Sequence, residues 1–530
     1  MKTNHKRQVF LAVLALVVAV VIHGGPSGVN AQVKGDKKDV KKTKTGETKK
    51  SPEKKSTKKK TDTAAKKTAK KPITAIVGAD IYTVTSELIR RGTILIEDGK
   101  IKDVGQDLKI PEGAKVIDAK GRYIAPGFVS INTSSVGIRG GTGSRDKYAD
   151  YLDPFDRNIK IALGVGITTG CMQMGSGGFT RRARNGEPIQ RFEGLDPEVD
   201  DILKTAEFNP DFGDPQTSVC PCCGLPILPS GPLTDAELAD GAEANPKATA
   251  ISTSKHAIVK MSYGTLDSML VADSVFFQVN ASSLSGGLNR HNWRNTIAAA
   301  RKYLKDQAAH EAKVKAGDKK SKPPRKPVPD NLLKLVKKEI PLRTRAFSAE
   351  QIRAMLDLAK ELDYRIILDG VTEGWLLPDE LAEAGAAVVI TPRSRRAANF
   401  AEEDSSGSNV ESSRIYEQSG VAFAVSPLAT SISLNGLAGR DLTSLPIEAA
   451  WAVRGGCSEK AALASITIEP AKMMGLEDRI GSIEKGKDAD LLILNGTPLD
   501  YRTYVETAFV NGRIVYERAK DRVFPVYERN

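Results

Sequence analysis

Short apolar runs rich in β-branched residues follow one another from residue 73 onward. They cover residues 73–77, 81–84 and 93–96, and Gly, Asp and Glu residues separate them. Asp98-Gly99, placed just before Ile101, is typical of a tight hairpin turn. This pattern predicts a small β-sheet unit over residues 73–123.

From Ile124 the pattern changes to alternating strands and helices. Strand-like apolar runs alternate with amphipathic helical stretches, the runs covering residues 340–344, 364–368, 386–390 and 420–425. Ser348 and Gln351 form a capping box that opens a helix through Leu362. The alternation predicts a parallel sheet with helices outside it, and the length from 124 to 470 suits a (β/α)8 barrel with insertions at about 180–255 and 306–330.

Beyond Pro470 the chain returns to short strands. They cover residues 490–494, 507–510 and 513–516, and Asn511-Gly512 marks a turn between the last two. Because strands and helices alternate between these ends, the predicted fold class is α/β. A TIM-like barrel over 124–470 is accompanied by a small composite β-sandwich made from 73–123 and 471–530.

The N-terminus has the pattern of an export signal. A basic start up to Arg7 precedes an apolar run over residues 9–22, and Val29-Asn30-Ala31 is a small-residue cleavage site. A membrane-spanning helix needs roughly 20 apolar residues, so a single-span anchor is the weaker alternative. The sequence predicts a signal peptide over 1–31 and an exported protein, periplasmic or associated with the cell envelope.

The net charge of +13 is concentrated in one segment. Residues 34–72 contain 17 lysines and five acidic residues and almost no apolar side chains, which predicts a disordered Lys-rich linker over 32–72. The chain after residue 72 is nearly neutral. Two interpretations are open for the linker: a solvated spacer, or a tether to an anionic envelope polymer or lipid. Export argues against a nucleic-acid partner.

Motifs at the two ends resemble those of a known family. At the entry to the predicted barrel stand Gly99-Lys100-Ile101 and Pro126-Gly127-Phe128; at its exit stand Glu469-Pro470-Ala471 and the run Gly486-Lys487-Asp488-Ala489-Asp490. Together they resemble the amidohydrolase superfamily, most closely its imidazolonepropionase-like members, over roughly 73–530. The resemblance implies a (β/α)8 barrel with a composite β-sandwich. It also implies metal-dependent hydrolysis of carbon–nitrogen bonds other than peptide bonds.

The resemblance also implies where metal ligands should stand. In the family, His-x-His after strand 1, histidines on strands 5 and 6 and an aspartate after strand 8 hold zinc or another divalent metal. The matching positions here hold Asn132, Ser134, Arg345, Asp369 and Ser426. A cation at Arg345 would repel a divalent ion, and neutral Asn132 and Ser134 are poor zinc ligands. We therefore expect no metal at the barrel site and no cofactor, and we assign no catalytic residue.

Cys220, Cys222 and Cys223 form a second candidate site. Their Cys-Pro-x-Cys-Gly arrangement has the shape of one zinc knuckle, but a structural zinc needs four ligands and no second Cys-x-x-Cys exists in the chain. In an oxidising compartment a local disulfide fits equally well. Both interpretations stay open.

Three hypotheses of function follow. The favoured one is a non-catalytic descendant that binds a small-molecule ligand at the barrel mouth or acts as a scaffold. In it, the five substituted positions face the mouth, and Arg345 and Asp369 are candidates for an ion pair. The alternative is a hydrolase of carbon–nitrogen bonds with altered or metal-free chemistry, with Asp369 as general base. In the third, an envelope-associated interaction protein binds through its lysine-rich linker.

Overall fold

The computed structural model describes residues 72–134, 136–138, 148–173, 256–279, 284, 287–318, 321–394, 406–432 and 441–523. The chain divides into two compact units, Met1–Thr68 and Ala69–Asn530, and all described residues belong to the second. The predicted signal peptide, the linker up to residue 71, the insertion at 180–255 and Cys220, Cys222 and Cys223 lie outside the described residues. Within the described part, no helix has the length and apolar character needed to cross a membrane.

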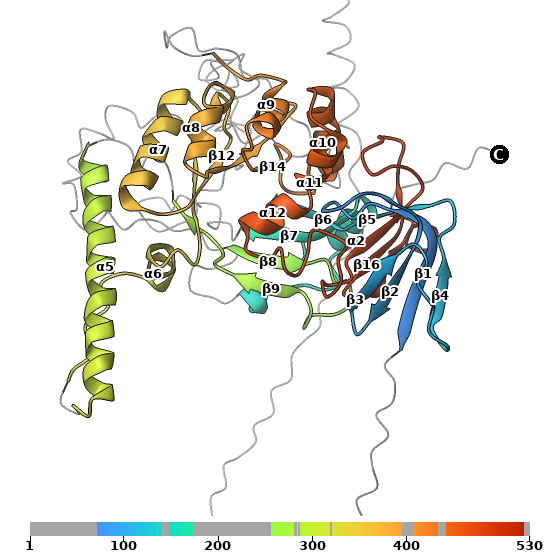
Figure 1. Cartoon of the computed structure of the whole chain (residues 1–530), viewed down its shortest axis with the longest axis horizontal. Coiled ribbons are helices and arrows are strands. Elements are labelled where there is room, and N and C mark those ends of the chain that lie inside the picture. The colour runs from blue at the N-terminus through green and yellow to red at the C-terminus, as the bar shows by residue number, and fades with distance from the viewer. Residues whose placement is uncertain are drawn as a thin grey trace, which may run out of the picture. The chain divides into compact units, whose positions relative to one another are not determined.

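One eight-stranded sheet joins strands from both ends of the described chain (Figure 1). Its order is β17-β16-β15-β5-β1-β2-β3, with β4 paired to β1. The strands are β1 (Ile73–Ile81), β2 (Ile89–Glu97), β3 (Lys100–Gly105), β4 (Lys115–Asp118), β5 (Tyr123–Pro126), β15 (Leu491–Leu494), β16 (Val505–Val510) and β17 (Arg513–Glu517). The two ends meet where β15 pairs antiparallel with β5, Leu491 lying opposite Pro126.

The turns and the buried positions of this shared sheet follow the sequence pattern. Asp98 and Gly99 both have positive φ, 55° and 77°, and turn β2 into β3 as the hairpin signal predicts. Alternate apolar side chains from both ends of the chain, including Ile76, Ile94 and Leu491, form one buried cluster. That this sheet closes into a β-sandwich stays a prediction.

A second sheet has five parallel strands in chain order, β10-β11-β12-β13-β14. They are β10 (Phe277–Gln278), β11 (Leu342–Arg345), β12 (Ile366–Asp369), β13 (Ala387–Ile390) and β14 (Phe423–Val425). The connecting helices are α5 (Gly287–Lys315), α6 (Asp330–Val336), α7 (Ala349–Leu362), η3 (Gly374–Leu376), α8 (Pro378–Glu383) and α9 (Ser412–Gln418). The predicted alternation of strand and helix is confirmed here, and the predicted insertion at 306–330 comprises the end of α5 and the segment leading into α6.

A third sheet, β6-β7-β8-β9, departs from the all-parallel prediction. Its strands are β6 (Phe128–Thr133), β7 (Ile167–Gln173), β8 (His256–Lys260) and β9 (Leu270–Asp273); η1 (Tyr148–Tyr151) and α2 (Arg157–Gly164) lie between β6 and β7. β6 and β7 are parallel, but β8 is antiparallel to both β7 and β9. The link between β8 and β9 is too short for a crossover, which requires a dozen or more residues, so the two strands form an antiparallel pair.

The segment between α11 (Glu459–Ala464) and α12 (Ile468–Met473) connects the second and third sheets. Val425 at the end of β14 donates its N–H to Ser465 O (3.0 Å), and Val129 of β6 donates to Ile466 O (2.7 Å). The last helical pieces are η4 (Leu442–Ser444), α10 (Leu445–Arg454) and α13 (Arg518–Asp521). The architecture is TIM-barrel-like with mixed sheets; among the described residues the strands do not form one closed parallel sheet.

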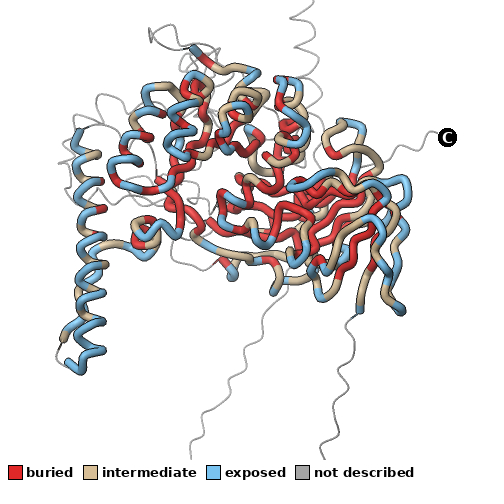
Figure 2. The backbone as a smooth tube through the Cα atoms, viewed as in Figure 1, coloured by how far each residue is buried: buried red, intermediate tan, exposed pale blue. Residues whose placement is uncertain are grey.

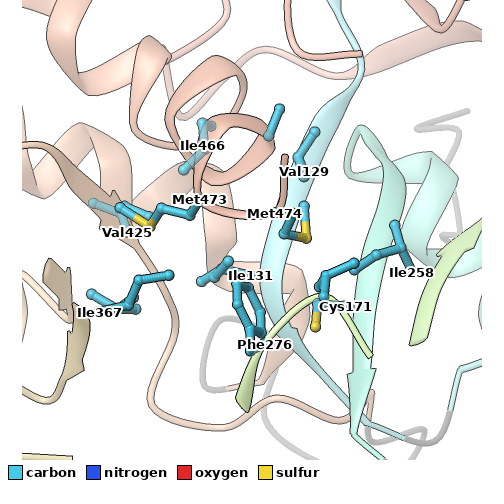
Figure 3. Close-up of a cluster of buried hydrophobic side chains, with 14 of the residues drawn as sticks. Val129, Ile131, Cys171, Ile258, Phe276, Ile367, Val425, Ile466, Met473 and Met474 are labelled. Carbon is cyan, nitrogen blue, oxygen red and sulfur yellow. The ribbon is translucent and has the colours of Figure 1, made fainter. Parts of the chain in front are cut away.

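The main hydrophobic core lies where these sheets converge. Val129, Cys171, Phe276 and Val425 come from different strands and loops and lie close together with Ile466 (Figure 3). Buried positions concentrate in the strands and on the helix sides that face them (Figure 2). This packing fixes the strand ends that carry the candidate site.

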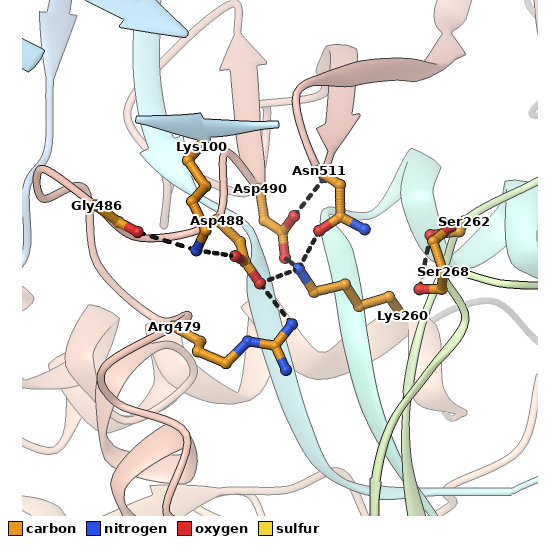
Figure 4. A network of polar contacts seen from close by, with 9 residues as sticks. All are labelled: Lys100, Lys260, Ser262, Ser268, Arg479, Gly486, Asp488, Asp490 and Asn511. Atoms are coloured by element: carbon orange, nitrogen blue, oxygen red, sulfur yellow. Dashed lines mark hydrogen bonds and ion pairs between the residues drawn. The ribbon is translucent and has the colours of Figure 1, made fainter. Parts of the chain in front are cut away.

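A buried ionic network links β8 to the shared sheet (Figure 4). The Nζ of Lys260, which is fully buried, lies 2.8 Å from Asp488 Oδ2 and 3.0 Å from Asp490 Oδ2, and it also donates to Asn511 Oδ1. Asp488 accepts further bonds from Lys100 Nζ and Arg479 Nη2, both at 2.9 Å.

The pKa values of the two carboxylates in this network are shifted in opposite directions. Burial acts to raise the pKa of Asp488, but the hydrogen bonds and charges of Lys260, Lys100 and Arg479 lower it to about 2. For Asp490, burial outweighs the attraction of Lys260 and raises the pKa. The Gly486-to-Asp490 motif therefore has a structural role: it places two carboxylates around the lysine of β8.

Candidate functional site

Arg343 occupies the middle of the candidate site. Its side chain is fully buried within β11, and it forms a bidentate ion pair with Asp369 at the end of β12. Nε donates to Asp369 Oδ2 (2.9 Å) and Nη2 to Asp369 Oδ1 (3.0 Å). Two parallel N–H···O bonds are the strongest geometry an arginine and a carboxylate can form.

The remaining donors of the guanidinium reach β6. Nη1 donates to the carbonyl oxygen of Ile131 (3.2 Å), and Nη2 donates to Asn132 Oδ1 (2.6 Å). Asn132 Nδ2 in turn donates to Ser426 Oγ (3.2 Å), just beyond β14. We call Arg343, Asp369, Asn132 and Ser426 the Arg343 network; it joins residues in or directly after four strands, β6, β11, β12 and β14.

The surroundings of Arg343 favour its charged form. Burial opposes the charge, but the Asp369 carboxylate outweighs burial and raises the pKa of the guanidinium. The Phe276 ring adds a cation–π contact, with the guanidinium carbon 5.0 Å from its centroid. The neighbouring Cys171 thiol stays protonated, because burial raises its pKa to about 12.

Arg345 is a correction to the sequence prediction. Its Cα lies opposite that of Asp369 in the strand register, but its side chain is exposed, and the ion pair with Asp369 is made by Arg343. Residues two apart in a strand share a face, so both arginines belong to the same row, and the one deeper in the strand is buried. That spacing marks Arg343 as a second candidate on the same strand face, without indicating which of the two arginines is buried.

Ser134 lies apart from the Arg343 network. Its N–H donates to Thr430 O (2.8 Å), and its hydroxyl lies 3.1 Å from Thr430 Oγ1. These bonds tie the end of β6 to the segment after β14. The structure therefore brings Asn132, Asp369 and Ser426 together, and places Ser134 and Arg345 outside their network.

The described residues do not fit the metal site that the resemblance implies. Among them there is no group of three or more His, Cys, Asp and Glu side chains that could hold a metal ion. The Asp369 carboxylate is engaged by a cation, and amide and hydroxyl groups such as those of Asn132 and Ser426 are weak zinc ligands.

The histidines of the described chain lie elsewhere and have other partners. His256 Nε2 accepts a bond from the N–H of Phe276 (2.8 Å), and this ring stacks on that of Phe276. His291 contacts Asn295, and His310 contacts Ser321, both within α5 or just after it. None of these contacts is with the Arg343 network.

Glu373, a second carboxylate four residues after Asp369, acts as a cap. The buried side chain accepts the backbone N–H of Ala349 (2.9 Å), the first residue of α7, and those of Ser406 (2.7 Å) and Gly407 (3.1 Å). Half of the predicted capping box forms: Ser348 Oγ accepts the N–H of Gln351 (3.3 Å), while Gln351 Oε1 accepts the N–H of Phe347 (3.0 Å). Glu373 therefore fixes the loop beside the site.

Replacing Glu373 by alanine is expected to lower the free energy of unfolding by about 2–3 kcal/mol, because three backbone donors would lose a charged acceptor. Urea denaturation followed by circular dichroism measures the effect. Glu350→Ala, at an exposed position in the first turn of the same helix, is the matched control. Equal stability of the two variants would show that the capping role is wrong.

One segment of the chain matches a known protein family. The amidohydrolase family model matches residues 374–515. A dihydroorotase of Aquifex aeolicus is 34% identical over 76 residues, which are 14% of this chain and 16% of the relative. An N-acetylglucosamine-6-phosphate deacetylase of Mus musculus is 36% identical over 62 residues, 12% of this chain and 14% of the relative. The matched segments thus span about one seventh of these curated relatives.

Likeness in structure extends much further along the chain. The crystal structure of an amidohydrolase from Thermotoga maritima MSB8 matches with a TM-score of 0.53 and 22% identity, covering 84% of this chain and 100% of that one. This similarity shows a shared fold. It supports the TIM-barrel-like architecture read from the strands.

The expectation that no cofactor is needed is contradicted by these comparisons. An adenosine deaminase from Xanthomonas campestris, similar over 85% of this chain and 94% of its own with 14% identity and a TM-score of 0.41, contains bound zinc. The expectation is withdrawn, because the amidohydrolase family match gives no ground for it. What stays is the observation on this chain's own residues, whose donor set at the Arg343 network does not fit a divalent metal.

The family match and the curated relatives lead to one assignment: residues 374–515 carry an amidohydrolase family segment, and the fold around it is the one shared with the Thermotoga maritima amidohydrolase.

Proposed function

We propose that this protein is a non-catalytic, ligand-binding member of the amidohydrolase superfamily. The observation that carries the proposal is the bidentate pair of Arg343 with Asp369. A general base must present a carboxylate oxygen to the reacting proton, whereas both oxygens of Asp369 accept bonds from a buried guanidinium. Arginine does not give up its proton in proteins, so the pair offers no acid–base couple.

The ligand would bind above the Arg343 network. Arg345 supplies an exposed cation at the end of β11, and the half-buried Ser134 supplies a hydroxyl at the end of β6. These groups suit a small polar molecule with a carboxylate or phosphate group. In this proposal the Arg343 network is the rigid floor of the site, and Arg345 provides the charge that selects the ligand.

A second function, hydrolysis of carbon–nitrogen bonds, is favoured by one specific observation. The family match at 374–515 begins directly after Asp369 and Glu373 and includes Ser426, so this side of the site lies beside or inside the region shared with the family. The names of the relatives, dihydroorotase and N-acetylglucosamine-6-phosphate deacetylase, suggest the compounds to test.

The experiment that separates the two is a hydrolysis assay on full-length protein with dihydroorotate and N-acetylglucosamine-6-phosphate, each with and without added zinc or manganese. We expect the wild type and Asp369→Asn to be indistinguishable in every arm. Turnover by the wild type that Asp369→Asn abolishes, while Arg345→Ala retains it, would contradict the non-catalytic proposal and establish the hydrolase.

We further propose that the protein is exported and that residues 34–72 tether it to an anionic envelope polymer or lipid. The support is the signal-like pattern before residue 32 and the 17 lysines of the linker. Cell fractionation tests this proposal: release of the protein with the cytoplasmic fraction would contradict it.

A further inference from the structure

The second half of helix α5 projects from the folded body. α5 has 29 residues, and its buried side chains, Trp293, Ile297 and Ala300, all lie in its first half. From Arg301 to the end of the helix no residue is buried, as the exposed colouring of its lower part shows (Figure 2). At 1.5 Å per residue this exposed half extends for about 22 Å.

The chain then returns along the helix and anchors again. His310 Nδ1 lies 2.7 Å from Ser321 Oγ, and Val328 packs against the main core. The return segment contains four prolines, which restrict its backbone: Pro323, Pro324, Pro327 and Pro329. We call the described residues 301–318 and 321–329 the basic arm.

The charge of the arm contrasts with that of the body. Its described residues include eight basic side chains and three acidic ones, Asp306, Glu311 and Asp318, which gives a net charge of +5. The chain after residue 72 is nearly neutral as a whole. Two of the basic groups are engaged locally, Arg301 with the carbonyl of Leu362 and Lys326 with Asp330. The other six have exposed side chains: Lys302, Lys305, Lys313, Lys315, Lys322 and Arg325.

The chemistry of the arm's surface narrows the kind of partner. Val314 is the one large apolar side chain of the described arm that is strongly exposed, at 51%. Protein interfaces need an apolar or aromatic centre, and interfacial helices need an apolar face to enter a membrane. The arm has neither, so its attraction to a partner is electrostatic.

Nucleic acid is a poorer fit than a simpler polyanion. Binding of single strands uses aromatic side chains on which bases stack, whereas the described arm's aromatic residue is a partly buried Tyr303. Arginine provides bidentate contacts to phosphate, but five of the six exposed cations are lysines, which act as point charges. Lysine point charges of this kind suit carboxylates that repeat along a linear chain.

We propose that the basic arm binds a linear acidic polysaccharide through the carboxylates of its sugar units. The exposed half of the helix holds Lys302 and Lys305 near its base and Lys313 and Lys315 near its tip, so cations stand at both ends of it, with Asp306 and Glu311 between them. Binding would be diffuse and salt-dependent, because each contact exchanges a counterion. The arm would thus supply a second attachment point, within the folded body and independent of the ligand at the strand ends.

The test compares two lysine-to-glutamine triple variants of the full-length protein on immobilised polygalacturonate. The first is Lys305→Gln, Lys313→Gln and Lys315→Gln on the arm. The matched control, Lys109→Gln, Lys115→Gln and Lys120→Gln, removes three exposed charges near β3, β4 and β5. Both variants keep residues 34–72, so any contribution of that segment is the same in each. Glutamine retains helix propensity, and thermal unfolding checks that both remain folded.

We expect the arm variant to bind roughly tenfold more weakly at 50 mM salt, with a salt dependence reduced by about two counterions, and the control to match the wild type. Equal loss in both variants would overturn the proposal, since binding would then follow total charge. Arm-dependent binding that is stronger to duplex DNA or to phosphatidylglycerol vesicles than to polygalacturonate would overturn it as well. Loss of polysaccharide binding leaves the proposed ligand site at Arg345 unaffected, so the two proposals fail separately.

Discussion

Replacing Arg343 by methionine is expected to lower the free energy of unfolding by about 3–5 kcal/mol, the largest effect of any single substitution at the candidate site. The reason is that Asp369 would remain buried without the cation that holds both of its oxygens. Asn132 and the carbonyl of Ile131 would lose their donors at the same time. Chemical denaturation of the purified protein measures the change.

Arg345→Met is the matched control, because it removes the same kind of side chain from an exposed position two residues along the same strand. Its stability should equal that of the wild type within error. A strongly destabilised Arg345 variant beside an unaffected Arg343 variant would restore the arrangement that the sequence suggests, with Arg345 as the partner of Asp369.

Replacing Lys260 by methionine is expected to cost a comparable 3–5 kcal/mol, because two buried carboxylates would lose the cation between them. Asp488 retains Lys100 and Arg479, so most of the penalty should come from Asp490, whose charge burial already opposes. Adding Asp490→Asn to Lys260→Met should therefore recover part of the lost stability. No recovery would contradict this explanation.

The contacts of Lys260 also predict how the free energy of unfolding changes as the pH falls. The pKa of Asp488 is lowered to about 2, so its stabilising contribution is present above the usual aspartate range and is lost as the pH falls from about 4 to about 2. Lys260→Met removes part of that lowering, and its unfolding free energy should fall less steeply over this window than that of the wild type. The measurement is a pH series of urea denaturations on both proteins.

The ends of the chain were the most predictable part of the fold. Local signals act on their own: near the N-terminal end Asp98-Gly99 turns a hairpin because it tolerates positive φ, and in the middle of the chain Ser348 caps α7. The sharing of one sheet by both ends also followed from strand-rich patterns and family-like motifs. The hairpin and the helix cap depend on few long-range contacts, whereas the shared sheet forms through the pairing of β5 with β15.

The parts that were missed depend on packing and register. The antiparallel direction of β8 follows a long insertion, and an apolar run such as that of β8 has no direction of its own. At the site, Asp369 was identified as a substituted position, but Arg343 was passed over in favour of Arg345. Sequence alone does not indicate which of two arginines on one strand face is buried.

The most direct test of the Arg343 network is a double-mutant cycle of Arg343→Met and Asp369→Asn, measured by chemical denaturation. If the two side chains form the buried pair seen here, the losses should be strongly non-additive, with a coupling energy of about 2–3 kcal/mol. Additive losses, within about 0.5 kcal/mol, would mean that the two groups act independently. Asp369 would then be available for chemistry, and the non-catalytic proposal would lose the observation on which it depends.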